Sequence, residues 1–153
     1  MQQIQDFSIR YSKPEDYEPV VFMASKFVKK IFPEEKVDFT KIRSLFSKSL
    51  ENNTISCLVL VDKLDEPKGF ILASISELYF HPKVVASCLA IWVEEEYRGH
   101  SKKLIKAFEK WAKYKKADFA SISAYEGVSP DKLDKLYQAY GYRLIEKMYW
   151  KDN

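Results

Sequence analysis

The sequence has few of the residues that bind metals or form cross-links. Its 153 residues include only two cysteines and two histidines. Cys57 and Cys88 lie in separate apolar, β-type runs without Cys-x-x-Cys spacing, so we expect both to be buried, reduced thiols. His81 and His100 each stand alone in the sequence, which gives a metal site no support.

The sequence also lacks a strong charge imbalance and a long hydrophobic run. A net charge of +3 argues against a nucleic-acid-binding protein, which usually has a clearer basic excess. No segment approaches the roughly 20 apolar residues that span a bilayer, and residues 1–7 have no apolar signal core. We therefore expect a soluble, cytoplasmic protein with no membrane partner. With 46% hydrophobic and 31% charged residues, the chain does not fit the disordered class.

Apolar periodicity divides the chain into alternating strand-like and helix-like segments. All four glycines fall at predicted turns, and no linker or repeat separates the segments, which favours one domain over residues 1–153. We expect an α/β (α+β) fold with a mixed, mostly antiparallel sheet and helices on both faces. The predicted order is β-α-α-β-β-β-α-β-α-β, with strands at 7–11, 54–62, 69–80, 84–93, 118–124 and 142–150 and helices at 15–31, 38–50, 101–115 and 130–140.

The stretch from residue 84 to residue 115 is the best candidate for a binding site. It reads as a strand, a polar loop at 94–101 and a helix that begins near Ser101. The first N–H groups of a helix lack intrahelical partners and form an anion site together with the positive end of the helix dipole. Gly99 would let the backbone approach a phosphate closely, and Lys102 and Lys103 add positive charge. The alternative is an ordinary strand–loop–helix unit with solvated lysines.

Two segments in this order resemble the GNAT superfamily of N-acetyltransferases, and the likeness covers nearly the whole chain. Family members carry Val-x-Pro-x-Tyr-Arg-Gly after the fourth strand, followed by a glycine-rich turn and a helix. Residues 93–105 read VEEEYRGHSKKLI here. The later family signature, Leu-Tyr-x-x-x-Gly-Phe, corresponds to LYQAYGY at residues 136–142. The closing segment is most similar to phage-encoded members of the family.

The resemblance implies that acetyl-CoA binds in a notch between the fourth and fifth strands. The diphosphate would lie on the backbone of residues 98–103, and the pantetheine amides would pair with the strand edge at 91–93. The tyrosine that often serves as general acid in the family matches Tyr137, whose hydroxyl would protonate the leaving thiolate. The cofactor-binding residues implied are Ile91, Trp92, Val93, Arg98, Gly99, His100, Ser101, Lys102 and Lys103.

The sequence also departs from the family pattern. Ser101 and Lys103 replace two small residues of the glycine-rich turn, and the apolar helix positions arrive about two residues early. No acid lies within residues 89–93 to serve as the general base. Glu77, the cluster at 94–96 and Glu126 are candidates, each with the alternative of being a solvated surface residue.

Two functions remain open from the sequence. The first is an acetyltransferase in which an amine, on a small molecule or a protein, attacks the acetyl carbonyl directly. Its acceptor would enter past the first two helices and the loop at 125–129. The second is a catalytically silent protein of the same fold, such as a phage virion or assembly component, with exposed aromatics Tyr79, Phe80 or Trp150 at a partner surface. A homodimer or a larger protein assembly is left open.

Overall fold

The computed structural model describes residues 6–51, 53–125 and 129–153, and the chain divides into two compact units, Met1–Ser123 and Ala124–Asn153. In the first unit five strands form one sheet in sequence order. Strands β1 to β4 pair antiparallel, whereas β4 and β5 pair parallel. This confirms the predicted mixed, mostly antiparallel sheet; that the two units make one domain stays a prediction. The strands are β1 (Ser8–Tyr11), β2 (Ile55–Val61), β3 (Pro67–Leu78), β4 (His81–Val93) and β5 (Phe119–Ser121).

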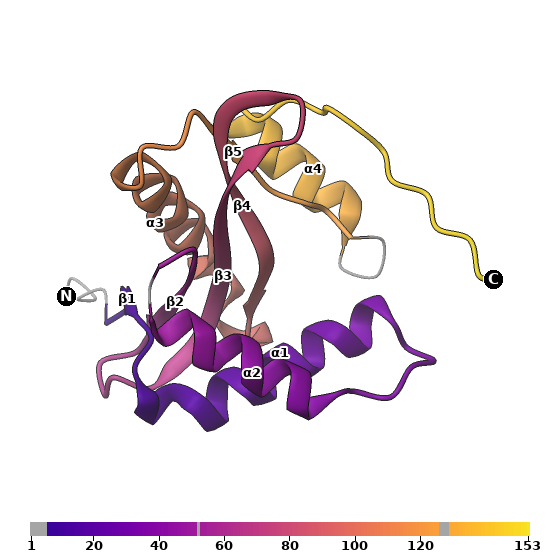
Figure 1. Cartoon of the computed structure of the whole chain (residues 1–153). Helices are drawn as coiled ribbons and strands as arrows, with labels where there is room; N and C mark the ends of the chain where they lie inside the picture. Colours follow the sequence, from indigo (N-terminus) through magenta and orange to yellow (C-terminus); the bar gives the residue numbers. More distant parts are fainter. Residues whose placement is uncertain (1–5, 52, 126–128) are drawn as a thin grey trace. The chain divides into compact units, whose positions relative to one another are not determined.

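Helices cover both faces of this sheet (Figure 1). On one face α3 (Ser101–Tyr114) places Leu104 and Phe108 in a cluster with Leu58 and Leu60 of β2. Helices α1 (Tyr17–Ile31) and α2 (Phe39–Leu50) contact the sheet from the other face. Because successive strand residues point to opposite faces, Val59 is buried on the side of α1 and α2. Strand β2 is therefore covered on both faces, which explains its largely apolar sequence.

Local signals fix the helix ends. Asp38 caps α2, because its Oδ1 accepts a hydrogen bond from the Lys41 amide at 3.0 Å. In the second unit α4 (Pro130–Ala139) ends at Gly141, whose φ of 89° is accessible to glycine at little cost. The Gly141 amide donates to Gln138 O and the Tyr142 amide donates to Tyr137 O, both at 3.0 Å. This pattern is a Schellman motif, and it stops the helix where the sequence predicts.

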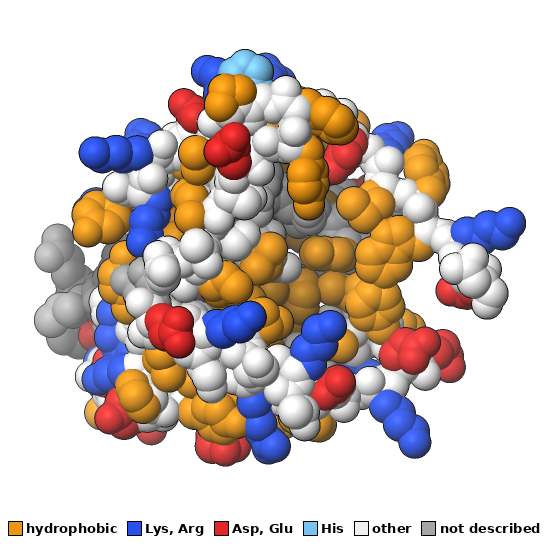
Figure 2. Space-filling model, viewed as in Figure 1, with side chains coloured by type: hydrophobic (Ala, Val, Ile, Leu, Met, Phe, Trp, Pro, Cys, Tyr) orange, Lys and Arg blue, Asp and Glu red, His pale blue; other side chains and the backbone are white. Residues whose placement is uncertain are grey.

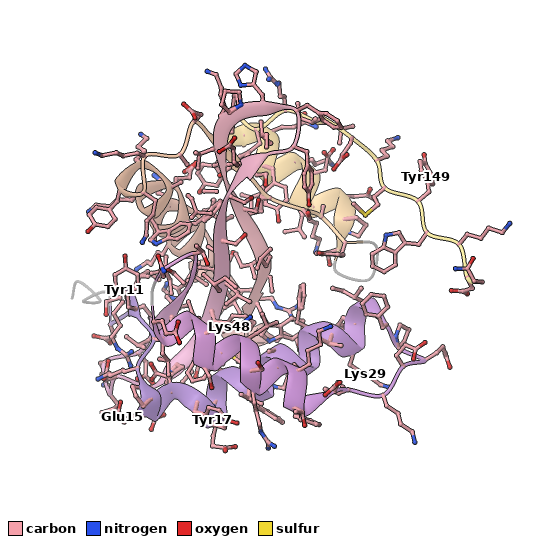
Figure 3. All side chains as sticks on the ribbon, in the orientation of Figure 1. Tyr11, Glu15, Tyr17, Lys29, Lys48 and Tyr149 are labelled. Atoms are coloured by element: carbon pink, nitrogen blue, oxygen red, sulfur yellow. The ribbon has the colours of Figure 1, made fainter. Side chains whose placement is uncertain are left out.

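The predicted strand at 142–150 is not a strand in the structure. Residues 142–153 have no regular secondary structure. Tyr149 projects away from the chain and is 86% exposed (Figure 3). An apolar, aromatic segment forms a stable strand only when a neighbouring strand pairs with the N–H and C=O groups of its backbone. Within the described ranges, residues 142–150 have no such neighbour.

Other strand boundaries also differ from prediction. Strand β3 runs from Pro67 to Leu78 instead of over 69–80, so Gly69 lies inside the strand and not at a turn. Strand β4 begins at His81, three residues before the predicted start. Pro82 fits because the register between β3 and β4 is irregular there, so a missing N–H costs no regular ladder bond. Tyr79 and Phe80 connect the two strands and are almost fully exposed. Strand β5 is shorter than the predicted 118–124, since it pairs with β4 over three residues only.

The surface over α1 and α2 mixes charges of both signs with hydrophobic side chains (Figure 2). No helix within the described residues combines the length and the apolar character needed to cross a bilayer.

Candidate functional site

Strand β4 contains a bulge close to the end of its pairing with β5. Leu72 pairs with Ala90 and Ala73 pairs with Cys88, so Leu89 is an additional residue on β4. Such a bulge kinks a strand and increases its twist, and bulges are common beside functional sites. On its other edge β4 pairs with β5 only as far as Ser87. Strand β5 ends there, and beyond this point the second edge of β4 has no strand partner among the described residues.

The main chain of β4 points toward this unpaired edge at two positions. The Glu94 amide donates to Lys68 O at 2.9 Å. In an antiparallel pair, hydrogen-bonded and non-bonded residue pairs alternate. Trp92 therefore exchanges its bonds with Phe70, whereas the N–H and C=O groups of Ile91 and Val93 point away from β3. These two residues present main-chain donors and acceptors that a ligand could use.

The side chains at the end of β4 are occupied by packing. Trp92 and Val93 are 7% and 5% exposed, and Ile91 is half-buried. Trp92 Nε1 donates to Glu94 Oε1 at 3.2 Å. The predicted contribution of residues 91–93 to a ligand site thus depends on their backbone, which matches the added-strand mode of binding.

The segment that follows β4 is helical, and the prediction of an irregular loop at 94–101 is wrong. Glu95–His100 forms a 3₁₀ turn, η2, that continues directly into α3. A 3₁₀ turn pairs each N–H with a carbonyl three residues earlier. The Ser101 amide accordingly donates to Arg98 O, and Ser101 Oγ donates to the same oxygen at 2.8 Å. Ser101 is therefore already engaged within the turn.

Gly99 lies on the exposed side of this turn. A Cβ atom built at Gly99 would meet nothing within 4 Å. The space beside the start of α3 is thus open to a group larger than a methyl. Lys102 is exposed and Lys103 is half-buried, both in the first turn of α3, where a positive charge adds to the helix dipole.

Arg98 and His100 make contacts that sequence reasoning missed. Arg98 Nε donates to the outward carbonyl of Val93 at 3.1 Å, and its guanidinium lies 5.2 Å from the centre of the Trp92 ring. His100 stacks on Phe7 with the ring centres 4.1 Å apart. No sequence pattern predicts either contact, because both depend on how the 3₁₀ turn is oriented against the sheet.

Tyr137 belongs to the second unit. Its side chain is 6% exposed, and its ring centre lies 6.1 Å from that of Tyr142. The ring of Tyr137 is thus packed within the second unit. The role of Tyr137 as general acid stays a prediction, as do the ligand-binding roles of residues 91–93 and 98–103.

The candidate acids separate into two kinds. Glu94 is paired, because both of its carboxylate oxygens accept from Lys26 Nζ, at 2.7 and 3.0 Å. Glu77, Glu95 and Glu96 are exposed. Glu126 and Gly127, together with the middle of the expected acceptor loop at 125–129, lie outside the described residues.

Glu94 and the η2 turn also line a cavity of about 550 Å³ in the first unit. Its walls come from α1, from the beginning of β3 and from the segment after β4. The lining side chains are those of Pro19, Phe22, Met23, Pro67, Lys68, Glu94, Glu95, Glu96 and Tyr97. Local sequence patterns do not group α1 with residues 94–97, so this cavity was not predicted.

The two cysteines are free and buried, as predicted. Burial raises the pKa of the Cys57 thiol and of the Cys88 thiol to about 12 each, because a thiolate is poorly solvated inside the sheet. Neither thiol is poised to act as a nucleophile. Among the described residues no three His, Cys, Asp or Glu side chains group closely enough to hold a metal ion.

Comparison with known proteins identifies the fold. No protein-family model matches the sequence, and no curated protein sequence matches it. A point mutant of the BH1408 protein from Bacillus halodurans superimposes with a TM-score of 0.78 at 16% identity, over 95% of this chain and 99% of that chain. An acetyltransferase from Trypanosoma brucei gives 0.70 at 15% identity, over 97% and 100% of the two chains.

A third solved structure contains a ligand. AAC(6')-Iy, in complex with the bisubstrate analog CoA-S-monomethyl-acetylneamine, superimposes with a TM-score of 0.72 at 18% identity, over 96% of this chain and 97% of that chain. Identities this low establish the fold alone. The chain has the α+β fold of the GNAT acetyltransferases, as the resemblance in its sequence implies.

Proposed function

We propose that this protein is an N-acetyltransferase that moves the acetyl group of acetyl-CoA to an amine. One observation carries the proposal. Strand β4 continues past its last pair with β5 at Ser87, and the outward main chain of Ile91 and Val93 lies on this unpaired edge, ahead of the start of α3. An extended, amide-containing arm that ends in a phosphate group has the shape and the hydrogen-bonding groups that such a site requires.

The pantetheine arm would bind as an added strand. Its amides would pair with the outward N–H and C=O groups of Ile91 and with the outward N–H of Val93. The Val93 carbonyl already accepts a bond from Arg98, so Val93 contributes chiefly its donor. The diphosphate would lie over Gly99 and the first turn of α3, where the dipole and Lys102 favour negative charge.

The chemistry follows from positioning more than from a reactive side chain. The acceptor nitrogen, after losing a proton to water or a carboxylate, attacks the acetyl carbonyl carbon while the main chain near Val93 polarises the carbonyl oxygen. The C–N bond forms, the C–S bond breaks, and the sulfur leaves with the electron pair. Tyr137 then donates its hydroxyl proton to the thiolate.

A silent protein of the same fold is the second candidate. The observation that favours it is Ser101, whose amide and hydroxyl both bond to Arg98 O and are thereby withdrawn from a ligand. A phage-type assembly component would use exposed aromatics such as Tyr79 and Phe80. For either function the two buried, reduced thiols suit the cytoplasm, where disulfides seldom form.

Calorimetric titration of acetyl-CoA separates the two functions. We expect micromolar binding to the native protein and to Gly99→Ala, since a methyl at this position meets open space. Gly99→Trp fills that space and is expected to abolish binding while the far-UV circular dichroism stays unchanged. Native protein that binds no acetyl-CoA, or a Gly99→Trp variant that binds it normally, would contradict the proposal.

A further inference from the structure

One ring near the N-terminus contacts two side chains of the η2 turn. The ring centre of Phe7 lies 5.5 Å from that of Tyr97 and 4.1 Å from that of His100. The planes of the Phe7 and His100 rings differ by 25°, so these two rings stack, whereas the Tyr97 ring is tilted by 50°. Since none of the six residues of η2 is buried, ring contacts contribute much of what holds this turn against the sheet.

Phe7 connects this turn to the core of the first unit. It directly precedes β1 and is half-buried. Its side chain packs against the hydrophobic cluster that contains Leu104 and Phe108 of α3, and Tyr97 packs against the same cluster. A close-packed core moves little, so a ring that rests on it is a firm support for an exposed turn.

The contact with His100 reaches the start of α3. His100 occupies the N-cap position of this helix, and its side chain makes no capping hydrogen bond. The side-chain bond that often fixes a helix start is therefore missing. The stack on Phe7 holds the His100 ring instead, and with it the backbone from which the first turn of α3 begins. The amides of this turn are those expected to face the diphosphate.

We propose that Phe7 is a positioning residue for the diphosphate of acetyl-CoA, acting through its contacts with His100 and Tyr97. The assignment rests on the proposed function. Phe7 keeps η2 and the first turn of α3 in one orientation before the ligand arrives, so binding does not have to order them. The pantetheine arm is expected on β4, which the ladder to β3 holds in place, and does not depend on Phe7.

The test compares acetyl-CoA with acetyl-pantetheine, which lacks the diphosphate. Phe7→Leu keeps an apolar side chain against the core and removes the ring. In titrations followed by NMR, we expect this variant to weaken acetyl-CoA about five- to tenfold and acetyl-pantetheine less than about twofold. An equal loss for the two ligands would mean that the variant disturbs the whole site. That result, or no loss for acetyl-CoA, would overturn the proposal.

Two matched variants separate positioning from general stability. Phe7→Tyr keeps the ring and should retain the native affinity for acetyl-CoA. Tyr17→Leu removes a half-buried ring from another contact, with Phe46, at 5.4 Å between the ring centres. It should destabilise the fold to a similar degree and leave acetyl-CoA binding unchanged. If Tyr17→Leu weakens acetyl-CoA as much as Phe7→Leu does, the effect is one of stability and the proposal fails.

The ligand-free protein gives a second readout. Phe7→Leu should lower the ¹H–¹⁵N heteronuclear NOE of the Gly99, Ser101 and Lys102 amides and leave those of Ile91 and Val93 unchanged. A turn that stays as rigid in the variant would refute the positioning role even if acetyl-CoA binds. Native protein that binds no acetyl-CoA would refute the proposed function together with this inference, whereas normal binding to Phe7→Leu would refute the inference alone.

Discussion

Arg98 should stabilise the junction between β4 and α3 by a measurable amount. Its Nε donates to Val93 O at 3.1 Å, and its guanidinium lies 5.2 Å from the Trp92 ring centre. A hydrogen bond from a charged donor contributes about 1.5–3 kcal/mol when buried, and an exposed side chain falls at or below the lower end of that range. The cation–π contact adds about 0.5–1 kcal/mol. We therefore expect Arg98→Ala to lower the free energy of unfolding by about 1.5–2.5 kcal/mol.

Urea unfolding followed by far-UV circular dichroism measures this loss, with an unchanged m-value as the sign of an intact fold. Arg98→Lys keeps the charge but loses the fixed Nε geometry, so we expect it to recover about half of the effect. Arg143→Ala removes an exposed arginine from the C-terminal segment and should change stability by less than about 0.5 kcal/mol. An Arg98→Ala variant as stable as Arg143→Ala would refute the assigned role of the Val93 contact.

Three further predictions concern catalysis, acid sensitivity and thiol reactivity. Tyr137→Phe should lower kcat about 100-fold or more with little change in the KM for acetyl-CoA, and unchanged turnover would remove Tyr137 from the mechanism. Arg10 lowers the pKa of the Asp65 carboxyl from its usual 3.8. The ion pair therefore stabilises the fold above pH 3.8, and this stabilisation is lost as the pH falls further. In acid urea titrations, Asp65→Asn should lose less stability with falling pH than the native protein does. Cys57 and Cys88, with thiol pKa values raised to about 12, should react with Ellman's reagent at pH 8 only after unfolding, and rapid labelling of the native protein would contradict their burial.

The sequence predicts the sheet well because its signals are local. Strand β2 is an apolar run broken only by Ser56, and the polar turn at 62–66 separates it from β3. Gly141 correctly predicts the end of α4, because its positive φ is accessible to glycine at little cost. The prediction of a strand at 142–150 was wrong because it was based on composition. Strand formation also depends on a partner strand, which composition does not specify.

The details of the site depend on long-range geometry. The extra residue Leu89 is defined only by the register between β3 and β4. The contact of Arg98 with Val93 requires the 3₁₀ turn to direct the guanidinium back toward the strand. The cavity joins Phe22 of α1 to Tyr97 of η2, two residues whose proximity follows from helix packing against the sheet. Local patterns encode none of these relations.

The most direct test of the account is a map of the acetyl-CoA contacts on the protein. In ¹H–¹⁵N correlation spectra, addition of acetyl-CoA is expected to shift the amides of Ile91 and Val93 together with those of Gly99, Lys102 and Lys103. The outward N–H groups of β4 and the first turn of α3 would then respond as one site. Shifts confined to other elements, or no shifts at saturating acetyl-CoA, would contradict the account.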